Sequence, residues 1–246
     1  MHLAGYSKLP RVEIAALAGL DDDRVRRVAA EYRVPQTFRE YTDLLAAPNI
    51  DAVSVCLPNA LHLPVTVAAL KAGKHVLVEK PLARTAIEGR AMVEAARAHD
   101  RILMISFNHR YRGDVQWVKQ YIESGALGRI YYAKAHWMRR AGIPRLGSWF
   151  VNKEQAGGGP LVDLGVHILD IAMYLMGEPR ATAVSANTYC KLRQDDVGGG
   201  ILRSCRNHLS YVHSRTRSAQ RSKLACAPPM PSPSGAAKFC LPVPPV

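Results

Sequence analysis

The residues of this chain that could do chemistry begin with Asp163 and His167. They lie four positions apart in the run AGGGPLVDLGVHILDIAMYLMG, residues 156–177, and Asp170 follows three positions later. On a helix of 3.6 residues per turn, all three project from one face. Their neighbours are mostly apolar, so a carboxylate and an imidazole there are costly to bury unless they are paired or used. For the pair taken alone, a helix-start Asp and a satisfied core His remain the alternative.

A second polar pair, Glu79 and Lys80, stands in the motif AGKHVLVEKPLA, residues 72–83. The β-forming run before it predicts a short buried strand. Open α/β sheets bind their ligands at the carboxyl ends of strands, which is where this pair falls. A cis peptide before Pro81 would point Lys80 in a fixed direction. An exposed ion pair at a strand end is the alternative interpretation.

Together these stretches resemble the Gfo/Idh/MocA family of NAD(P)-dependent oxidoreductases, the glucose-fructose and inositol dehydrogenase family. The resemblance runs from about residue 2 to about residue 196. It is carried by AAPNIDAVSVCLPNALHLPVTVAALKAGKHVLVEKPLA (46–83), ILMISFNHRYRGDVQWVKQYIESGALGRIYYAKA (102–135) and GGGPLVDLGVHILDIAMYLMGEP (157–179). The order and spacing of three separate motifs make the resemblance specific, whereas EKP alone would be weak.

The resemblance implies a role for each matching residue. The catalytic group would be Lys80, Asp163 and His167. The nicotinamide cofactor, NAD or NADP, would be lined by Pro58, Asn59, His62, Glu79, Lys80, Pro81 and Asn108. The substrate, a polyol, a sugar or a sugar-derived carbonyl, would meet Asp163, His167, Arg110 and Trp149. No metal is implied, and family members usually associate, so we expect a homo-oligomer.

These residue types suit the oxidation of an alcohol, which needs a hydride acceptor and a base for the hydroxyl proton. An imidazole has an unperturbed pKa of about 6.5, so His167 can take or return that proton near neutral pH. Asp163 can orient the imidazole or hold a substrate hydroxyl. Lys80 can stabilise the developing alkoxide.

The sequence departs from the family pattern at the phosphate loop. The family places G-x-G-x-x-G after its first strand, and no such loop occurs here. Residues 1–6 resemble the helix that follows the loop, so we expect the first strand and the loop to be missing. Those glycines let the backbone approach the phosphates, so their absence predicts weak cofactor binding. Gly19 stands where the family has the acid that binds the adenosine ribose. Asp21, two residues further on, could take the place of that acid. The choice between NAD and NADP therefore stays open.

The elements that must position these motifs alternate between strands and helices. Strand patterns occupy residues 11–18, 51–57, 75–79 and 101–106, and helical patterns occupy residues 21–32, 40–47, 62–72 and 85–99. This alternation predicts an α/β domain over residues 1–106, a Rossmann-like parallel doubly wound sheet that lacks its first strand. Right-handed crossovers put the strand ends on one edge, where PNALH, EKP and FNHR would meet.

From residue 107 the pattern changes to a partial α+β domain, which we place at residues 107–196. It comprises a helix at residues 113–124, a strand at residues 130–136, the motif helix and a strand at residues 181–190. Trp137 and Trp149 could stack on a sugar face, or simply be packed inside the domain. Residues 197–246 form a Pro- and Ser-containing tail, for which we expect disorder and an origin outside the family.

The charge of the chain is uneven. Its formal net charge is +13, and residues 201–246 contribute seven Lys and Arg with no Asp or Glu, which leaves +6 for the rest. A basic tail can bind nucleic acid non-specifically, but neither an aromatic-interleaved groove nor zinc-ligand spacing accompanies it, so we expect no specific nucleic-acid partner. Five dispersed cysteines give no disulfide framework, and Cys56 is expected to be a small buried residue. Without a signal segment or an 18-residue apolar run, we expect a cytoplasmic protein that is not in a membrane.

Three functional hypotheses remain. The first is an NAD(P)-dependent oxidoreductase acting on a polyol or sugar. The second is a catalytically inactive fragment that keeps the fold but cannot hold a dinucleotide, and the missing glycine loop is the feature that separates the two. A binding or regulatory relative is the third, although the presence of Lys80, Asp163 and His167 argues for catalytic ancestry.

Overall fold

The computed structural model describes residues 2–138, 148–187, 210–211 and 237–242, the last two stretches as backbone alone. The chain forms two compact units. Unit 1 comprises Met1–Ser106, Glu154–Gly157 and Pro231–Val246, and unit 2 comprises Phe107–Lys153 and Gly158–Met230. The first division therefore falls between Ser106 and Phe107, where the sequence pattern changes from α/β to α+β.

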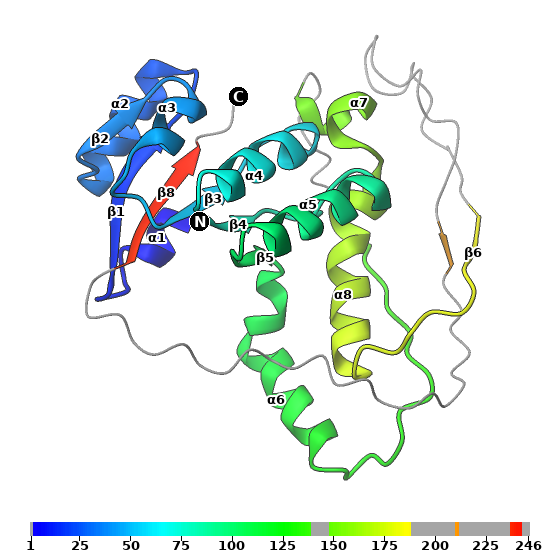
Figure 1. Ribbon diagram of the computed structural model, residues 1–246. Coiled ribbons are helices and arrows are strands. Elements are labelled where there is room, and N and C mark those ends of the chain that lie inside the picture. The colour runs from blue at the N-terminus through cyan, green and yellow to red at the C-terminus, as the bar shows by residue number, and fades with distance from the viewer. Residues whose placement is uncertain (1, 139–147, 188–209, 212–236, 243–246) are drawn as a thin grey trace. The chain divides into compact units, whose positions relative to one another are not determined.

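Unit 1 is built on a parallel sheet of six strands (Figure 1). In chain order these are β1 (Val12–Ala18), β2 (Gln36–Phe38), β3 (Ala52–Val55), β4 (His75–Val78), β5 (Leu103–Ile105) and β8 (Ala237–Pro242). Their spatial order is β2-β1-β8-β3-β4-β5. The parallel doubly wound sheet expected from the sequence is confirmed, and β2 is a strand that the pattern did not reveal.

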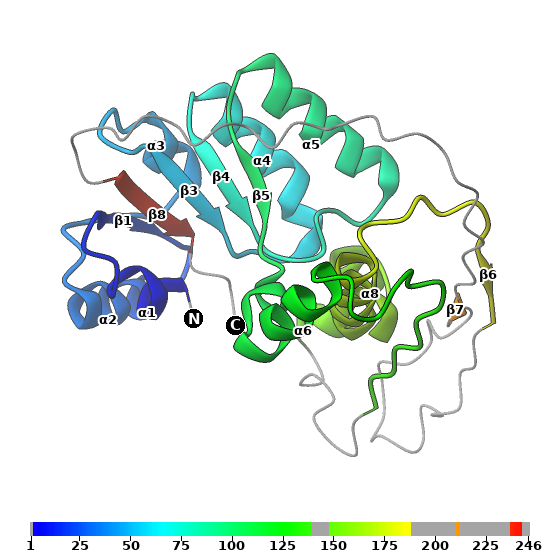
Figure 2. The same cartoon turned by 90° about the horizontal axis from the view of Figure 1, so that it is seen from below.

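Helices cover both faces of this sheet (Figure 2). In that view α1 (His2–Tyr6) and α2 (Asp22–Tyr32) lie below it, and α3 (Tyr41–Ala46), α4 (His62–Lys71) and α5 (Ala86–Ala98) lie above it. Each face has its own buried cluster, and the alternation of strand side chains divides the apolar residues between them. Ala16 and Ala18 of β1 belong to the larger cluster, whereas Leu17 belongs to the smaller one.

Two helices of unit 1 begin at caps that the sequence provides. The Asp21 carboxylate accepts a hydrogen bond of 3.0 Å from the Arg24 amide at the start of α2. The Thr85 hydroxyl accepts one of 3.2 Å from the Glu88 amide at the start of α5. Each bond satisfies an amide that has no partner within its own helix, which fixes where the helix begins.

Unit 2 contains mainly helical elements. They are η2 (Asn108–Tyr111), α6 (Gly113–Glu123), η3 (Trp149–Val151), η4 (Leu161–Gly165) and α8 (Val166–Leu175), with a short antiparallel pair of β6 (Ser185–Ala186) and β7 (Ser210–Tyr211). The helix α7 (Lys153–Ala156) crosses a unit boundary, because Lys153 belongs to unit 2 and the residues that follow it belong to unit 1. The helix expected at residues 113–124 is confirmed as α6.

Three expectations from the sequence are wrong in the described residues. The strand expected at residues 130–136 is not formed, because a strand needs a hydrogen-bonded neighbour and none of the described residues pairs with this segment. The strand expected at residues 181–190 is reduced to Ser185–Ala186, with residues 188–190 outside the described part. The tail expected to be disordered supplies β8 to the sheet of unit 1.

One stretch of the described residues, Lys153–Leu175, is long and apolar enough to cross a membrane by length and composition. A single helix of this kind is weak evidence for a membrane span, since the core helix of a soluble protein passes the same test. Its apolar side chains belong to the motif in which Asp163 and His167 lie.

Candidate active site

The PNALH turn follows β3 at the carboxyl edge of the unit 1 sheet, and its polar side chains are buried. His62 is fully buried, with Nδ1 2.8 Å from the Pro81 carbonyl oxygen and Nε2 3.0 Å from that of Leu57. Burial lowers the pKa of His62, against the opposing effect of these carbonyls, so the neutral ring is favoured. His62 therefore ties the PNALH turn to the EKP motif, which confirms that these two motifs meet.

Glu79 and Lys80 follow β4, and the peptide bond between Lys80 and Pro81 is cis. The Glu79 carboxylate lies 2.6 Å from Nε2 of His2 and accepts a hydrogen bond from the Lys80 amide. Burial opposes ionisation of Glu79, but His2, the Lys80 amide and the Ser106 hydroxyl outweigh it and lower the pKa of this carboxyl. Glu79 is therefore a carboxylate at neutral pH, held at the strand end where the sequence places it.

The short segment Glu154–Gly157 belongs to unit 1 and packs on the same motifs. The Asn59 side-chain amide donates to the Ala156 carbonyl oxygen at 2.7 Å, and Arg84 donates to that of Glu154 at 2.8 Å. Gly157 has φ +79°, and a Cβ there would lie 2.7 Å from Cγ of Arg84, so only glycine fits. This segment leads directly into the motif that holds Asp163, six positions further along the chain.

Asp163 and His167 lie in consecutive elements of unit 2. Asp163 lies in η4, which is a π-helical turn, and His167 lies in α8; both side chains are half-buried. The sequence predicts an α-helix through both residues, whereas in the structure the turn that holds Asp163 is the wider π-helix. Such turns inside helices occur often at functional sites, because they re-aim side chains relative to the regular helix.

His167 lies in an aromatic stack that the sequence does not reveal. The His109 ring stacks on it with a centroid distance of 4.4 Å, and the Trp137 ring lies 6.2 Å away. His109 also stacks on Trp137 at 5.4 Å. His109 is the middle residue of the motif FNHRY. The sequence analysis predicts site roles for its neighbours Asn108 and Arg110 but not for His109. Its position between these two residues is the signal that could have identified it.

Arg110 is engaged by two carboxylates of unit 2. Its Nε and Nη2 bond both oxygens of the buried Asp170 at 2.6–3.0 Å, and its Nη1 lies 3.0 Å from Glu178. The guanidinium also lies over the Tyr174 ring at 5.0 Å from the centroid. Such a fork-to-fork pair fixes both side chains, so Arg110 contributes packing around α8 in this structure. Asp170 is thus the buried partner of Arg110.

The remaining predicted residues have simpler surroundings. Asn108 is exposed at the start of η2, and the ring of Trp149 stacks on Phe150 with centroids 3.8 Å apart. Asp21 is the N-cap of α2. Lys80 belongs to unit 1, and Asp163 and His167 belong to unit 2, so the predicted catalytic group draws on both units.

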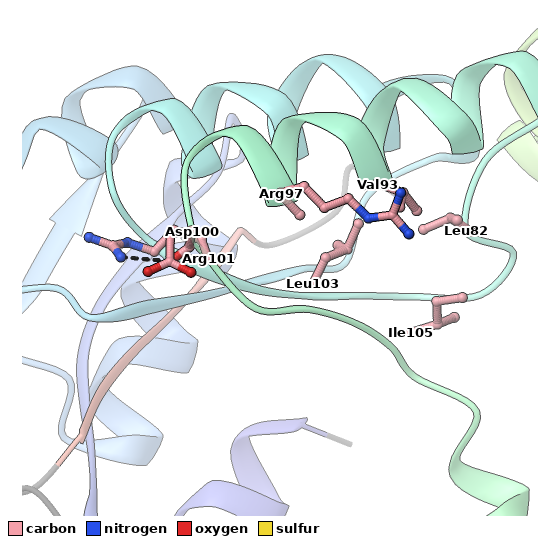
Figure 3. A pocket seen from close by; sticks show the side chains of 8 residues that line it. Leu82, Val93, Arg97, Asp100, Arg101, Leu103 and Ile105 are labelled. Atoms are coloured by element: carbon pink, nitrogen blue, oxygen red, sulfur yellow. Dashed lines mark hydrogen bonds between the residues drawn. The ribbon is translucent and has the colours of Figure 1, made fainter. Parts of the chain in front are cut away.

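A pocket of about 320 Å³ lies in unit 1 (Figure 3). Side chains of α5, of β5 and of their connection line it, together with Leu82. None of the predicted site residues lines this pocket. Among the described residues, no group of three or more His, Cys, Asp or Glu could hold a metal ion.

The order of the unit 1 strands, read as 3-2-1-4-5-6 with β8 as strand 1, is that of dinucleotide-binding Rossmann folds. Comparison with protein families agrees with this class. The family model described as "Oxidoreductase family, NAD-binding Rossmann fold" matches residues 1–107, and the model of the "GFO/IDH/MocA C-terminal domain" matches residues 115–226. The chain therefore belongs to the Gfo/Idh/MocA family, and the family match continues some 30 residues beyond the point at which we expected it to end.

Two of the similar proteins are named for dehydrogenation of a glucoside and of levoglucosan. The chain is 37% identical over 205 residues to D-glucoside 3-dehydrogenase of Escherichia coli, covering 83% of this chain and 56% of the relative. It is 33% identical to levoglucosan dehydrogenase of Pseudarthrobacter phenanthrenivorans, covering 74% and 47%. A solved levoglucosan dehydrogenase in complex with NADH and levoglucosan superposes with a TM-score of 0.63 at 32% identity, covering 72% and 48%. The chain thus spans about half the length of these relatives.

The residues present fit one half of a dinucleotide. The PNALH turn and the EKP motif lie together at the carboxyl edge, where a nicotinamide ring would be held. The pyrophosphate half of the dinucleotide has a poorer match. In the sequence, the central strand β8 is followed by Val243, Pro244, Pro245 and Val246. Proline has no backbone N–H, so these residues offer few of the donors that a pyrophosphate needs.

Proposed function

We propose that this chain belongs to an enzyme that transfers hydride between a nicotinamide cofactor and the carbinol carbon of a sugar or polyol. The observation that carries the proposal is the Asp163 and His167 pair, which stands on the η4–α8 turn of a chain that belongs to this oxidoreductase family. The names of the relatives support a sugar substrate. We also propose a homo-oligomeric, cytoplasmic protein, as expected from the sequence.

The three proposed catalytic residues divide the work on the substrate. His167 takes the hydroxyl proton as the alcohol is oxidised and returns it in reduction. Asp163 holds the imidazole or a neighbouring hydroxyl in place, and Lys80 stabilises the negative charge that develops on oxygen. The nicotinamide, when bound, accepts or donates the hydride. The stack of His109 and Trp137 restricts the rotation of the His167 ring, which keeps its orientation constant.

The test is a steady-state assay of NADH formation with glucosides, levoglucosan and inositols. The His167→Ala variant is expected to lower turnover by a factor on the order of 100 to 10,000, because a general base contributes that much. His99→Ala, at the exposed end of α5, is the matched control and should leave turnover unchanged. Equal rates for the wild type and His167→Ala would remove His167 from the mechanism.

A second candidate is favoured by one observation, the two prolines, Pro244 and Pro245, that follow β8 in the sequence. If the residues after β8 do not cradle a pyrophosphate, the chain is an inactive or binding relative of these enzymes. Titration with NADH and NADPH separates the two functions without any substrate. Binding in the micromolar range, about −8 kcal/mol, supports the enzyme, and absence of binding up to millimolar cofactor in a folded sample supports the inactive relative.

A further inference from the structure

A short piece of unit 1 interrupts unit 2. This strap, Glu154–Gly157, packs with unit 1, whereas the residues directly before and after it belong to unit 2. Ala156 is the only one of its four residues that is buried. Ordering a segment costs conformational entropy, and burial of one alanine offsets little of it, so the place of the strap depends on specific polar contacts. Two side chains of unit 1, Asn59 and Arg84, supply such contacts.

The contact with Asn59 is buried on both sides. Asn59 is 5% exposed and Ala156 is 4% exposed. The side-chain amide of Asn59 donates a hydrogen bond of 2.7 Å to the Ala156 carbonyl oxygen. A buried carbonyl oxygen that loses its donor is left desolvated and unsatisfied, which is more costly than the loss of an exposed hydrogen bond. Removal of this amide should therefore release the strap from unit 1 more often.

Arg84 contacts both ends of the strap. Its Nη1 donates to the Glu154 carbonyl oxygen at 2.8 Å, and its side chain packs so closely on Gly157 that a Cβ there would lie 2.7 Å from Cγ of Arg84. Glu88 holds the guanidinium in this position, with Oε1 2.6 Å from Nη2. This hydrogen bond lowers the pKa of Glu88, so the carboxylate that orients Arg84 stays charged at neutral pH.

The strap is joined to the turn of Asp163 by a short, closely packed connection. The Asp163 amide donates to the Gly159 carbonyl oxygen at 3.2 Å, and the Val162 amide donates to the same oxygen at 2.9 Å. A Cβ at Gly158 would lie 2.5 Å from Cγ2 of Val162, so this side chain packs directly on the connection. The turn that carries Asp163 is therefore hydrogen-bonded to a residue only two positions beyond the strap.

We propose that Asn59 and Arg84 are positioning residues, which hold the strap on unit 1 and thereby fix the start of the turn that carries Asp163. The proposal rests on the proposed function, in which Asp163 holds the imidazole of His167 or a substrate hydroxyl. Asn59 then acts through the strap, whereas the family resemblance implies that it lines the cofactor. The resemblance implies no role for Arg84.

The first measurement is hydrogen–deuterium exchange of the full chain, followed by mass spectrometry of peptides that cover the strap and residues 161–167. Asn59→Ala should raise the exchange rate in both peptides by about tenfold or more, because a buried carbonyl loses its donor. Arg84→Ala should raise it by about threefold or more, since the contact with Glu154 is exposed. Far-UV circular dichroism confirms that each variant is folded, and Arg84→Ala decides the question if Asn59→Ala does not fold.

Matched controls separate the strap contacts from general effects of substitution. Asn49→Ala and Arg90→Ala remove exposed side chains of the same two types from unit 1, so both should leave the exchange rates unchanged. Arg84→Lys keeps a cation beside Glu88 and a donor for the strap, and it should restore most of the protection that Arg84→Ala removes.

The second measurement separates positioning from cofactor binding. Asn59→Ala should lower kcat for the sugar substrate by about tenfold or more, because small displacements of a catalytic group have large effects on rate. Its dissociation constant for NADH, measured by fluorescence titration, should stay within about twofold of the wild type, since a positioning residue makes no contact with the cofactor. Arg84→Ala should behave in the same way, and Arg84→Lys should recover most of kcat.

Four results would overturn the proposal. Unchanged exchange in both folded variants would show that these side chains do not hold the strap. Faster exchange of the strap alone would show that it does not fix the turn at residues 161–167. Weaker NADH binding by Asn59→Ala with an unchanged strap would assign Asn59 to the cofactor. A loosened strap with unchanged kcat would remove the link to catalysis.

Failure of the proposed function has a different signature. A wild-type chain that neither binds NADH nor oxidises any of the sugars would refute that function. The exchange rates of the strap and of residues 161–167 require no cofactor or substrate. They would still show whether Asn59 and Arg84 fix the turn of Asp163.

Discussion

Truncation of Asp170 is the most informative perturbation of unit 2. Asp170 is the one buried residue of α8, with a side chain 7% exposed, and it accepts three hydrogen-bond contacts from Arg110. Asp170→Ala leaves a guanidinium that is 27% exposed without its main partner. The second carboxylate on that guanidinium, Glu178, is 63% exposed and compensates only in part.

The size of the effect follows from these exposures. Breaking a buried ion pair by removing one partner costs about 3–5 kcal/mol. Since Arg110 is partly exposed and keeps Glu178, we expect Asp170→Ala to lower the free energy of unfolding of unit 2 by about 2–3 kcal/mol. Glu178→Gln removes an exposed partner of the same guanidinium and should cost less than about 1 kcal/mol.

Urea denaturation followed by tryptophan fluorescence measures this change selectively. All three tryptophans, Trp117, Trp137 and Trp149, lie in unit 2. With a denaturant slope of about 1–2 kcal/mol per molar, Asp170→Ala should shift the midpoint down by about 1–3 M. Equal midpoints for Asp170→Ala and Glu178→Gln would refute the view that burial makes the Asp170 contact the stronger one.

Three further predictions concern unit 1. Gly157→Ala should destabilise unit 1 by about 2 kcal/mol or more, because residue 157 has φ +79° and its new Cβ would collide with Arg84. The measurement is a urea titration followed by far-UV circular dichroism. Gly73→Ala is the control, since its φ is +76° but no atom lies closer than 3.7 Å to the new Cβ. Burial lowers the pKa of His62 below its unfolded value of about 6.5. The contribution of neutral His62 to the free energy of unfolding should therefore be complete above about pH 6.5 and be lost as the pH falls through the folded pKa. Urea midpoints of the wild type and of His62→Gln should converge between pH 7 and pH 5. Cys56, expected from the sequence to be buried, is half-buried in the structure. Desolvation of its thiol, with the nearby Glu79 carboxylate, raises the pKa of Cys56 from 9.0 to about 12. Mass-spectrometric mapping at pH 8 should therefore show about a thousandfold slower alkylation of Cys56 in the folded chain than in urea, and comparable rates would contradict this raised pKa.

Much of unit 1 could be predicted from the sequence because its signals are local. The apolar runs at β1, β3 and β4 and the caps Asp21 and Thr85 are each readable within a few residues. The place of β8 could not be predicted, because AKFCLP has no strand signal of its own and its strand partners are β1 and β3, which are far away in the sequence. Long-range pairing depends on the unfilled edges of other strands, and a local pattern does not contain that information.

The candidate site was predictable in its residue types and less so in their surroundings. Spacing alone suggested that Asp163 and His167 share a helical face, but a π turn depends on packing around the helix rather than on residue spacing. The roles of Asp170 and His109 depend on contacts between segments about 60 residues apart, Arg110 with Asp170 and His109 with His167. Such contacts are determined by the tertiary structure, so one sequence without relatives could not specify them.

The position of β8 separates two properties that the family fold normally couples. In a Rossmann fold the innermost strand both completes the sheet and leads into the loop that cradles the pyrophosphate. Here the sheet is completed by Ala237–Pro242, while the residues that follow include Pro244 and Pro245, which have no N–H to donate. A stable unit 1 is therefore no argument for cofactor binding in this chain. Catalysis needs the PNALH and EKP motifs to be joined by a phosphate cradle, so the affinity for NADH, rather than the fold, decides between the enzyme and its inactive relative.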